Sequence, residues 1–163
     1  MKVEDAAYIA GIIDGDGYIG FQCQTRTEGK NRYHCWNYCV GITMIHYDLL
    51  NTINKMVNCG KGKVLIHTYQ PRGRAHRAYR ILWSGSRCID LLNEIRPYLR
   101  LKVAQADIIL QFAQKQEEAQ SQRSGQGHRY PDWLHVLAEN INKQICILNR
   151  RGIDRQSELL VKV

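Results

Sequence analysis

The chain has no long apolar run and no recognisable export signal. No stretch of about 18 consecutive apolar residues occurs among its 163 residues, so the sequence predicts no membrane-spanning helix. The N-terminus, Met-Lys-Val-Glu-Asp, has neither the apolar core of a secretory signal nor the acid-poor, Arg- and Ser-rich composition of a transit peptide. We therefore expect a protein that is not secreted and has no membrane partner.

Cysteine pairs of the kind that bind zinc are also absent from the sequence. None of the six cysteines forms a C-x2-C pair. Without a secretory signal, an even number of cysteines is weak support for disulfide bonds. We expect reduced, buried or half-buried thiols, because a free cysteine packs as a small apolar residue.

Acidic residues are scarce in one part of the chain. The 15 acidic residues are outnumbered by 23 Lys and Arg residues, which leaves a formal net charge of +8 and a pI near 9.3. Residues 18–87 carry eleven basic and two acidic side chains, a net +9, so the remaining 93 residues sum to −1. Such a concentration of positive charge favours a polyanionic partner.

Hydrophobic periodicity predicts one α+β domain over residues 1–163. The core is expected at about 5–113, a polar connector at 114–129 and a C-terminal helical segment at 130–163. Helices are predicted at 4–14, 46–58, 86–96, 102–116 and 131–148, and strands at 18–25, 33–43, 63–69 and 77–84, with a polar loop at 26–32. This αββαββα order, with helices appended, fits an antiparallel four-stranded sheet with one core face and one basic face.

The most specific motif is Ile9-Ala-Gly-Ile-Ile-Asp-Gly-Asp-Gly17. Asp14 and Asp16 lie at a predicted helix C-terminus, where the partial negative charge disfavours a carboxylate by roughly 0.3–1 kcal/mol. A cation would offset this cost, and Mg²⁺ is the natural candidate because it takes one or two carboxylates together with carbonyl and water oxygens. Ala10, Gly11 and Gly15 are small enough to let a second backbone approach the helix closely.

The motif resembles the signature of the LAGLIDADG homing endonucleases, which it matches at five positions: Ala10, Gly11, Asp14, Asp16 and Gly17. A second string, Pro-Tyr-Leu-Arg-Leu-Lys-Val-Ala-Gln-Ala from Pro97 to Ala106, is similar to a segment of the members that carry a single motif. The resemblance covers residues 5–113 well and the last 35 residues loosely. It implies the αββαββα homing endonuclease fold, with an antiparallel four-stranded DNA-binding sheet followed by C-terminal helices.

The resemblance also implies a hydrolase that cleaves DNA at a specific site with a divalent metal. It makes Asp16 and Lys102 the catalytic residues, with Asp16 and the Gly15 carbonyl at the metal. Mg²⁺ is the expected cofactor, and Mn²⁺ or Ca²⁺ would occupy the same sites. No small-molecule cofactor is expected. Asp14 is interpreted as structural, holding the end of the motif.

Because the chain carries one motif, the resemblance implies a homodimer on double-stranded DNA. The motif helix would form the dimer interface through Ile9, Ala10, Gly11 and Ile13. Each copy would cut one phosphodiester of a long pseudo-palindromic site, leaving 3′ overhangs. The family context is an intron-encoded protein of an organelle, either chloroplast or mitochondrion, or of a prokaryotic cytoplasm.

Strand alternation separates the side chains that would face DNA from those that would face the core. Gln22, Gln24, Asn37 and Arg80 suit base edges, because Gln and Asn pair with adenine and Arg with guanine. Arginines outside the strands are expected to contact phosphates. The full set of expected DNA-binding residues is Gln22, Gln24, Arg26, Asn37, His67, Tyr69, Arg72, Arg74, Arg77, Arg80, Arg150 and Arg151.

Two positions depart from the family pattern. Met44 and Asp48 stand where relatives often carry a glutamine and an arginine that organise solvent around the attacking water. His46 is a candidate substitute. These departures keep an alternative open, namely a nucleic-acid-binding protein of the same fold that does not cleave, such as an RNA maturase assisting intron splicing or a DNA-binding regulator. Asp16 and Lys102 favour the endonuclease.

Overall fold

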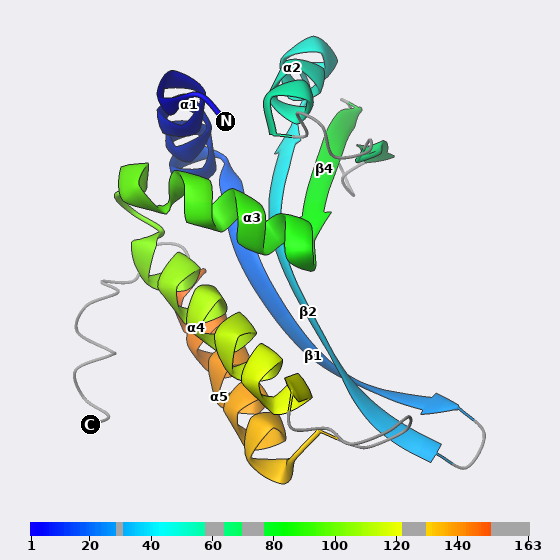
Figure 1. The fold of residues 1–163 in the computed structure, drawn as a ribbon. Coiled ribbons are helices and arrows are strands. Elements are labelled where there is room, and N and C mark those ends of the chain that lie inside the picture. The colour runs from blue at the N-terminus through cyan, green and yellow to red at the C-terminus, as the bar shows by residue number, and fades with distance from the viewer. Residues whose placement is uncertain (29–30, 58–63, 70–76, 122–129, 151–163) are drawn as a thin grey trace.

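The computed structural model describes residues 1–28, 31–57, 64–69, 77–121 and 130–150 (Figure 1). The elements are α1 (Val3–Gly15), β1 (Gly17–Glu28), β2 (Asn31–Met44), α2 (Tyr47–Val57), β3 (Ile66–Tyr69), β4 (Ala78–Ser84), α3 (Ser86–Ile95), the short 3-10 helix η1 (Arg96–Tyr98), α4 (Val103–Ser121) and α5 (Asp132–Leu148). The predicted αββαββα order with appended helices is confirmed.

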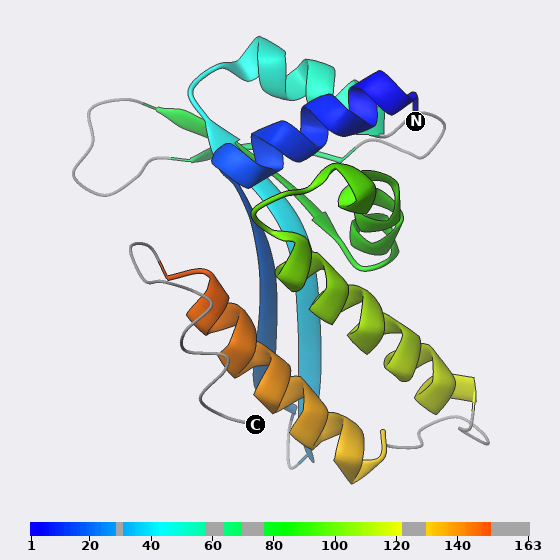
Figure 2. The ribbon, with the colours of Figure 1, turned by 90° about the vertical axis from the view of Figure 1, so that its left-hand side faces the viewer.

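The four strands form one antiparallel sheet in the order β1-β2-β4-β3. Figure 2 shows α1, α3, α4 and α5 in front of the strands, so these helices cover one face of the sheet. The core lies between the two layers. It contains Ile19, Phe21, Val40, Ile42, Ile81 and Trp83 from the strands and Ile9, Ile13, Leu92, Ile109 and Phe112 from the helices.

The β1–β2 hairpin is longer than the sequence predicted. Residues 26–32 were expected to form a loop, but β1 continues to Glu28 and β2 begins at Asn31. The pairing register continues without interruption from Gly17 opposite Ile42 to Glu28 opposite Asn31. Because a polar residue meets the hydrogen-bonding needs of a strand as well as an apolar one does, the polar composition of this stretch did not mark a strand end.

The predicted polar connector is helical over its first half. Helix α4 continues to Ser121, so residues 114–121 are not a connector. Gln, Glu, Lys and Ala are good helix formers, and Ala119 is buried against the core. The rest of the connector, 122–129, lies outside the described residues, as do residues 151–163.

Helices α4 and α5 bury one face each. In α4 the most buried face contains Ala106, Ile109 and Phe112, whereas Leu110 is only half-buried. Trp133 lies on the solvent side of α5 and is 47% exposed. Cys146 is exposed, contrary to the expectation for the thiols. In the described part of the chain, no helix is long and apolar enough to cross a membrane.

Candidate active site and nucleic-acid interface

The C-terminal end of α1 is joined to the segment that precedes α4. The carboxylate of Asp14 accepts hydrogen bonds from two backbone N–H groups, that of Arg100 at 2.6 Å and that of Lys102 at 3.0 Å. These donors lie in the short segment between η1 and α4. Asp14 therefore links two parts of the chain that are distant in sequence, which agrees with its predicted structural role.

Lys102 forms hydrogen bonds across the same junction, with its side chain donating to the backbone of α1. Its ammonium group donates to the carbonyl oxygens of Ile13 and Asp14, each at 2.6 Å. Only 9% of Lys102 is exposed. A helix C-terminus leaves carbonyl groups without intrahelical partners and carries partial negative charge. A buried ammonium stabilises it both by donating hydrogen bonds to these carbonyls and by offsetting the negative charge. Lys102 therefore places a positive charge at this helix end, separate from the Mg²⁺ that the sequence predicts there.

Asp16 lies just beyond this junction and is exposed. It caps α1 through its backbone, whose N–H donates to the Ile12 carbonyl at 2.8 Å. Gly15 is the last residue of α1, so its carbonyl lies at the end of the helical hydrogen-bond ladder. A carboxylate and a carbonyl are hard oxygen donors of the kind that Mg²⁺ takes.

One chain does not hold a complete metal-binding cluster among its described residues. Nowhere in those ranges do three or more His, Cys, Asp or Glu side chains gather as a metal site requires. The donor chemistry of Asp16 and Gly15 fits Mg²⁺, but further oxygen ligands must come from elsewhere. A second copy of the chain, water and phosphate are the sources that suit this ion.

The face of the sheet opposite the helices carries the predicted base-contacting side chains. Gln22 and Asn37 are paired across β1 and β2, and both are exposed. Phe21, next to Gln22, is buried in the core, and so is Val40, three positions after Asn37. This alternation confirms the predicted strand register at these positions, since a slip of one residue would reverse the two faces.

The second strand pair continues the same face. Arg80 lies opposite Thr43 on one side and His67 on the other, and its guanidinium donates to the Thr43 hydroxyl at 3.2 Å. His67 is exposed and Arg80 is half-buried. Tyr69 is the last residue of β3, opposite Ala78, and its side chain is not among those described. Sheet pairing thus gathers His67, Thr43 and Arg80 in one row.

Several predicted DNA-binding residues fall outside the described parts of the structure. The backbones of Gln24 and Arg26 belong to β1, but their side chains are not described. Arg72, Arg74 and Arg151 lie outside the described residues altogether. Arg77 is described and exposed just before β4. Their expected contacts with DNA stay predictions.

Arg150 lies where the end of α5 meets the start of the sheet. The side-chain amide of Asn149 donates to the carbonyl of Ile19 in the edge strand β1 at 2.9 Å, and that of Gln105 donates to the carbonyl of Leu148 at 3.3 Å. Ile19 is three positions after Asp16. The exposed Arg150 is therefore held near the end of the sheet that carries the motif.

The predicted dimer-interface residues do not share one face of α1. Ile9, Ala10 and Ile13 are fully buried within the single chain, so the prediction that these three side chains meet a second chain is wrong. Gly11 is exposed, and a Cβ atom placed on it or on Gly15 would meet nothing within 4 Å. Both faces of this helix have small or apolar residues, and the sequence could not show which one its own sheet would cover.

The open face of α1 contains residues that the sequence analysis missed. It carries Val3, Ala7, Tyr8, Gly11 and Gly15. Val3 is 63% exposed, although it is apolar. Spacing by three and four residues could have suggested this second stripe. An exposed apolar helix face next to Asp16 marks a contact surface.

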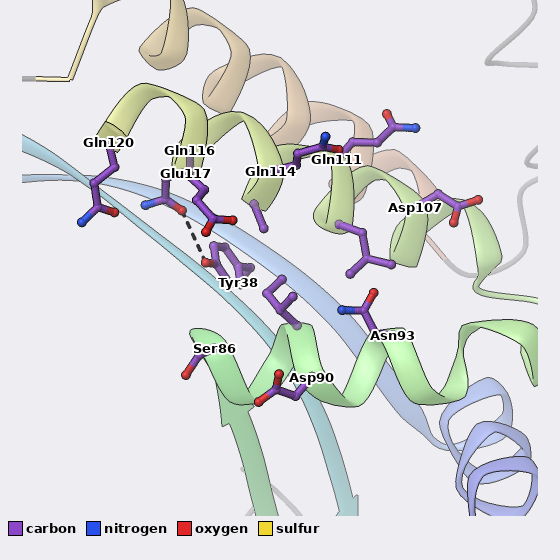
Figure 3. Close-up of a pocket in the computed structure, with 13 residues that line it drawn as sticks. Tyr38, Ser86, Asp90, Asn93, Asp107, Gln111, Gln114, Gln116, Glu117 and Gln120 are labelled. Atoms are coloured by element: carbon purple, nitrogen blue, oxygen red, sulfur yellow. Dashed lines mark hydrogen bonds between the residues drawn. The ribbon is translucent and has the colours of Figure 1, made fainter. Parts of the chain in front are cut away.

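The helical side of the molecule has a groove lined by acidic side chains, which do not favour a phosphate backbone. It lies between α3 and α4 and has a volume of about 790 Å³. Tyr38 lines it, and the Tyr38 hydroxyl is 3.4 Å from the side-chain oxygen of Gln116 (Figure 3). Asp90, Asp107 and Glu117 line it. Carboxylates repel DNA, so the sheet face is the nucleic-acid interface that the charges favour.

The αββαββα core, with an exposed aspartate at the end of its first helix, is the arrangement that the resemblance to the LAGLIDADG homing endonucleases implies. The DNA endonuclease I-CvuI of Chlorella vulgaris is 30% identical to this chain over 114 residues, which are 67% of this chain and 63% of that endonuclease. The chain spans less than two thirds of the length of that endonuclease, to which it is similar, and it carries one copy of a LAGLIDADG-like motif. No family model matches the sequence.

Solved structures show the same fold. I-CvuI bound to its target with Ca²⁺ gives a TM-score of 0.67 at 20% identity, covering 94% of this chain and 86% of that one. I-CvuI on the I-CreI target, with Mg²⁺ and uncleaved DNA, gives 0.70 at 19% identity, covering 99% and 97%. The archaeal intron-encoded endonuclease I-Vdi141I with DNA gives 0.54 at 15% identity, covering 86% and 96%. The predicted fold class is confirmed.

Proposed function

We propose that the chain is a site-specific homing endonuclease that binds a pseudo-palindromic double-stranded DNA site as a homodimer and hydrolyses one phosphodiester in each strand. The observation that carries this proposal is the position of Asp16. Its exposed carboxylate lies at the junction of the motif helix and the open sheet face. A side chain there reaches a phosphate of DNA that lies along the sheet. The products expected are 3′ overhangs.

Dimerisation through the open face of α1 would bring two such carboxylates together. Ala7, Gly11 and Gly15 recur at four-residue steps along that face, so a second helix can approach without steric conflict. In an isologous contact both copies use the same patch. One Asp16 and one Gly15 carbonyl from each copy would then face the same stretch of DNA.

Asp16 and the Gly15 carbonyl would hold the divalent cation, Mg²⁺ in this proposal. A divalent cation bound there supplies Lewis-acid stabilisation of the attacking and leaving oxygens of a phosphodiester. Lys102 acts in our proposal as a positioning residue, because its ammonium is committed to the carbonyls of Ile13 and Asp14. It fixes the end of α1 and so fixes where Asp16 projects.

The sheet would supply the sequence reading. Gln22, Asn37 and Arg80 would contact base edges in the major groove, where each good bidentate contact discriminates by about 1–3 kcal/mol. Arg77 and Arg150, with the arginines outside the described residues, would contact phosphates. A dimer with a formal charge twice +8 would bind less tightly as salt rises, because DNA binding releases condensed counterions.

A second function is favoured by Met44. Its side chain is half-buried and packs against the core, and it carries no group that could organise water. Asp48, in the first turn of α2, has the charge opposite to the arginine that relatives carry. These two residues support the alternative of a nucleic-acid-binding protein that does not cleave. The exposed His46 is the nearby side chain that could take over solvent ordering.

The test starts from a pool of randomised duplexes, because the target is unknown. Duplexes retained by the protein are amplified through several rounds, and the winning duplex is incubated with the protein and Mg²⁺. The joined DNA sequences that flank the gene serve as a second, independent probe. We expect one cut per strand and 3′ overhangs. Tight binding with no cut would instead support the non-cleaving protein.

A further inference from the structure

Tyr18 lies across the open face of the sheet in a way that strand alternation alone does not explain. It is paired with Gly41 of β2, and its neighbour Ile19 is fully buried, so Tyr18 belongs to the face away from the core. A Cβ atom placed on Gly41 would lie 2.5 Å from Cζ of Tyr18 and 2.7 Å from its hydroxyl oxygen. The ring thus occupies the space that a side chain at position 41 would otherwise fill.

The Tyr18 ring has close neighbours on two sides. On one side a Cβ atom at Gly20 would be 3.5 Å from the ring, an ordinary contact distance. At the other side the hydroxyl oxygen lies over Gly41 and beside Cys39. Tyr18 is therefore held in a defined orientation on the open face of the sheet.

The chemistry of this spot differs from that of the rest of the interface. Gln22, Asn37 and Arg80 offer hydrogen-bonding groups, whereas Tyr18 offers mainly the surface of an aromatic ring. Tyr18 is half-buried, so part of the ring stays accessible. The apolar feature of a base edge in the major groove is the C5 methyl group of thymine.

We propose that Tyr18 is a specificity-determining residue whose ring, placed over Gly41, contacts the methyl group of a thymine in the inner part of each half-site. This inference rests on the proposed DNA-binding function. The inner position follows from the chain itself, because Tyr18 is two residues after Asp16 and a strand advances about 3.3 Å per residue. The outer base pairs are left to Gln22 and Asn37, farther along the hairpin.

The experiment removes the methyl group and nothing else. In the duplex selected by the wild-type protein, each inner thymine is replaced in turn by deoxyuridine, and the dissociation constant is measured. We expect a loss of about fourfold at one position of each half-site, the factor that corresponds to about 0.8 kcal/mol for one buried methyl group. Deoxyuridine at outer positions serves as the control for general effects of the substitution.

Three variants separate the ring from its surroundings. Tyr18→Phe keeps the ring and should keep the fourfold sensitivity. Tyr18→Ala should lose it. Gly41→Ala should lose it too, because the new Cβ atom displaces the movable end of the Tyr18 side chain and leaves the backbone in place. A control that combines Tyr18→Ala with Gly41→Ala should be as insensitive to deoxyuridine as either single alanine variant.

The outcomes distinguish this inference from the proposed function. Selected duplexes without an inner thymine, an insensitive wild-type protein, or a sensitive Tyr18→Ala variant would each overturn the role of Tyr18 while the endonuclease proposal stands. Failure to enrich any duplex would overturn both. A Tyr18→Phe variant that loses the sensitivity would show that the hydroxyl group makes the contact, which also contradicts the inference.

Discussion

Lys102 and Asp14 show how single residues make the candidate site. They are 88 positions apart, and each hydrogen-bonds to the backbone of the other's segment. The sequence motifs predicted that both residues matter and that a cation belongs near the helix end. They could not show that Lys102 itself donates to this helix end, because a hydrogen bond between distant segments depends on the packing of α1 against the segment before α4.

The positioning role of Lys102 predicts a loss of stability as well as of activity. In Lys102→Met the carbonyls of Ile13 and Asp14 lose a charged donor in a buried site, and hydrogen bonds to charged groups contribute about 1.5–3 kcal/mol each. We expect the free energy of unfolding, measured by urea denaturation, to fall by about 3 kcal/mol. Lys115→Met, at an exposed ion pair with Glu118, should change it by less than about 1 kcal/mol.

The result for Lys102 separates two roles. If Lys102→Met unfolded at the same urea concentration as the wild type but failed to cleave, the side chain would act on the reacting atoms directly and our assignment would be wrong. Parallel loss of stability and cleavage is what a positioning residue produces.

At the scale of elements, glycines fix how α1, β1 and β2 meet. A Cβ atom on Gly17 would lie 2.7 Å from the Cα of Ile13 and 3.2 Å from the carbonyl oxygen of Gly41, and both contacts are with backbone. The sequence identified this glycine through the motif. It also predicted element order and strand faces well, because periodicity reports them directly, but it ended β1 and α4 too early and began β2 too late.

Those errors have one physical cause. Residues 26–32 and 114–121 are polar, and polarity was taken as a sign of loop structure. Pairing of the two long strands and burial of Ala119 determine these boundaries instead. Tertiary contacts therefore override local composition at element ends. The same applies to the open face of α1, which is determined by the burial of Ile9 and Ile13 in the core.

Gly17→Ala should destabilise the junction of these elements. The added methyl group meets backbone that cannot rotate away, and overpacking of this kind costs about 1–3 kcal/mol. Thermal unfolding followed by circular dichroism measures the effect. Gly20→Ala in the same strand is the matched control, since its Cβ atom would make only ordinary contacts of 3.4–3.5 Å. Equal melting temperatures for the two variants would contradict the proposed steric role of Gly17.

At the scale of the whole molecule, charge and symmetry act together. The basic residues concentrate in the part of the sequence that forms most of the sheet, while the groove on the helical side is lined by carboxylates. A monomer offers one Asp16, and two copies joined along α1 offer two. The dimer is therefore the unit that our functional proposal requires.

Gly11→Arg should separate the copies without unfolding either one. Gly11 is exposed and has open space around it within the chain, so an arginine there is tolerated by the monomer. Across a two-fold axis it would introduce bulk and two like charges. Sedimentation velocity should show a dimer for the wild type and a monomer for the variant. The melting temperature of the folded chain should be the same for both proteins. Gln144→Arg on the exposed side of α5 should remain dimeric, and a dimeric Gly11→Arg would rule out this interface.

The role of Asp16 is tested most directly by comparing the wild type with Asp16→Asn on the selected duplex. Both proteins are brought to the same DNA occupancy, Mg²⁺ is added, and the two strands are followed on a denaturing gel. We predict that the variant binds within about twofold of the wild type and cleaves both strands at least about 100-fold more slowly, since loss of a metal-binding carboxylate removes several kcal/mol of transition-state stabilisation. Cleavage by Asp16→Asn at the wild-type rate, or binding without any cleavage by the wild type, would contradict the account.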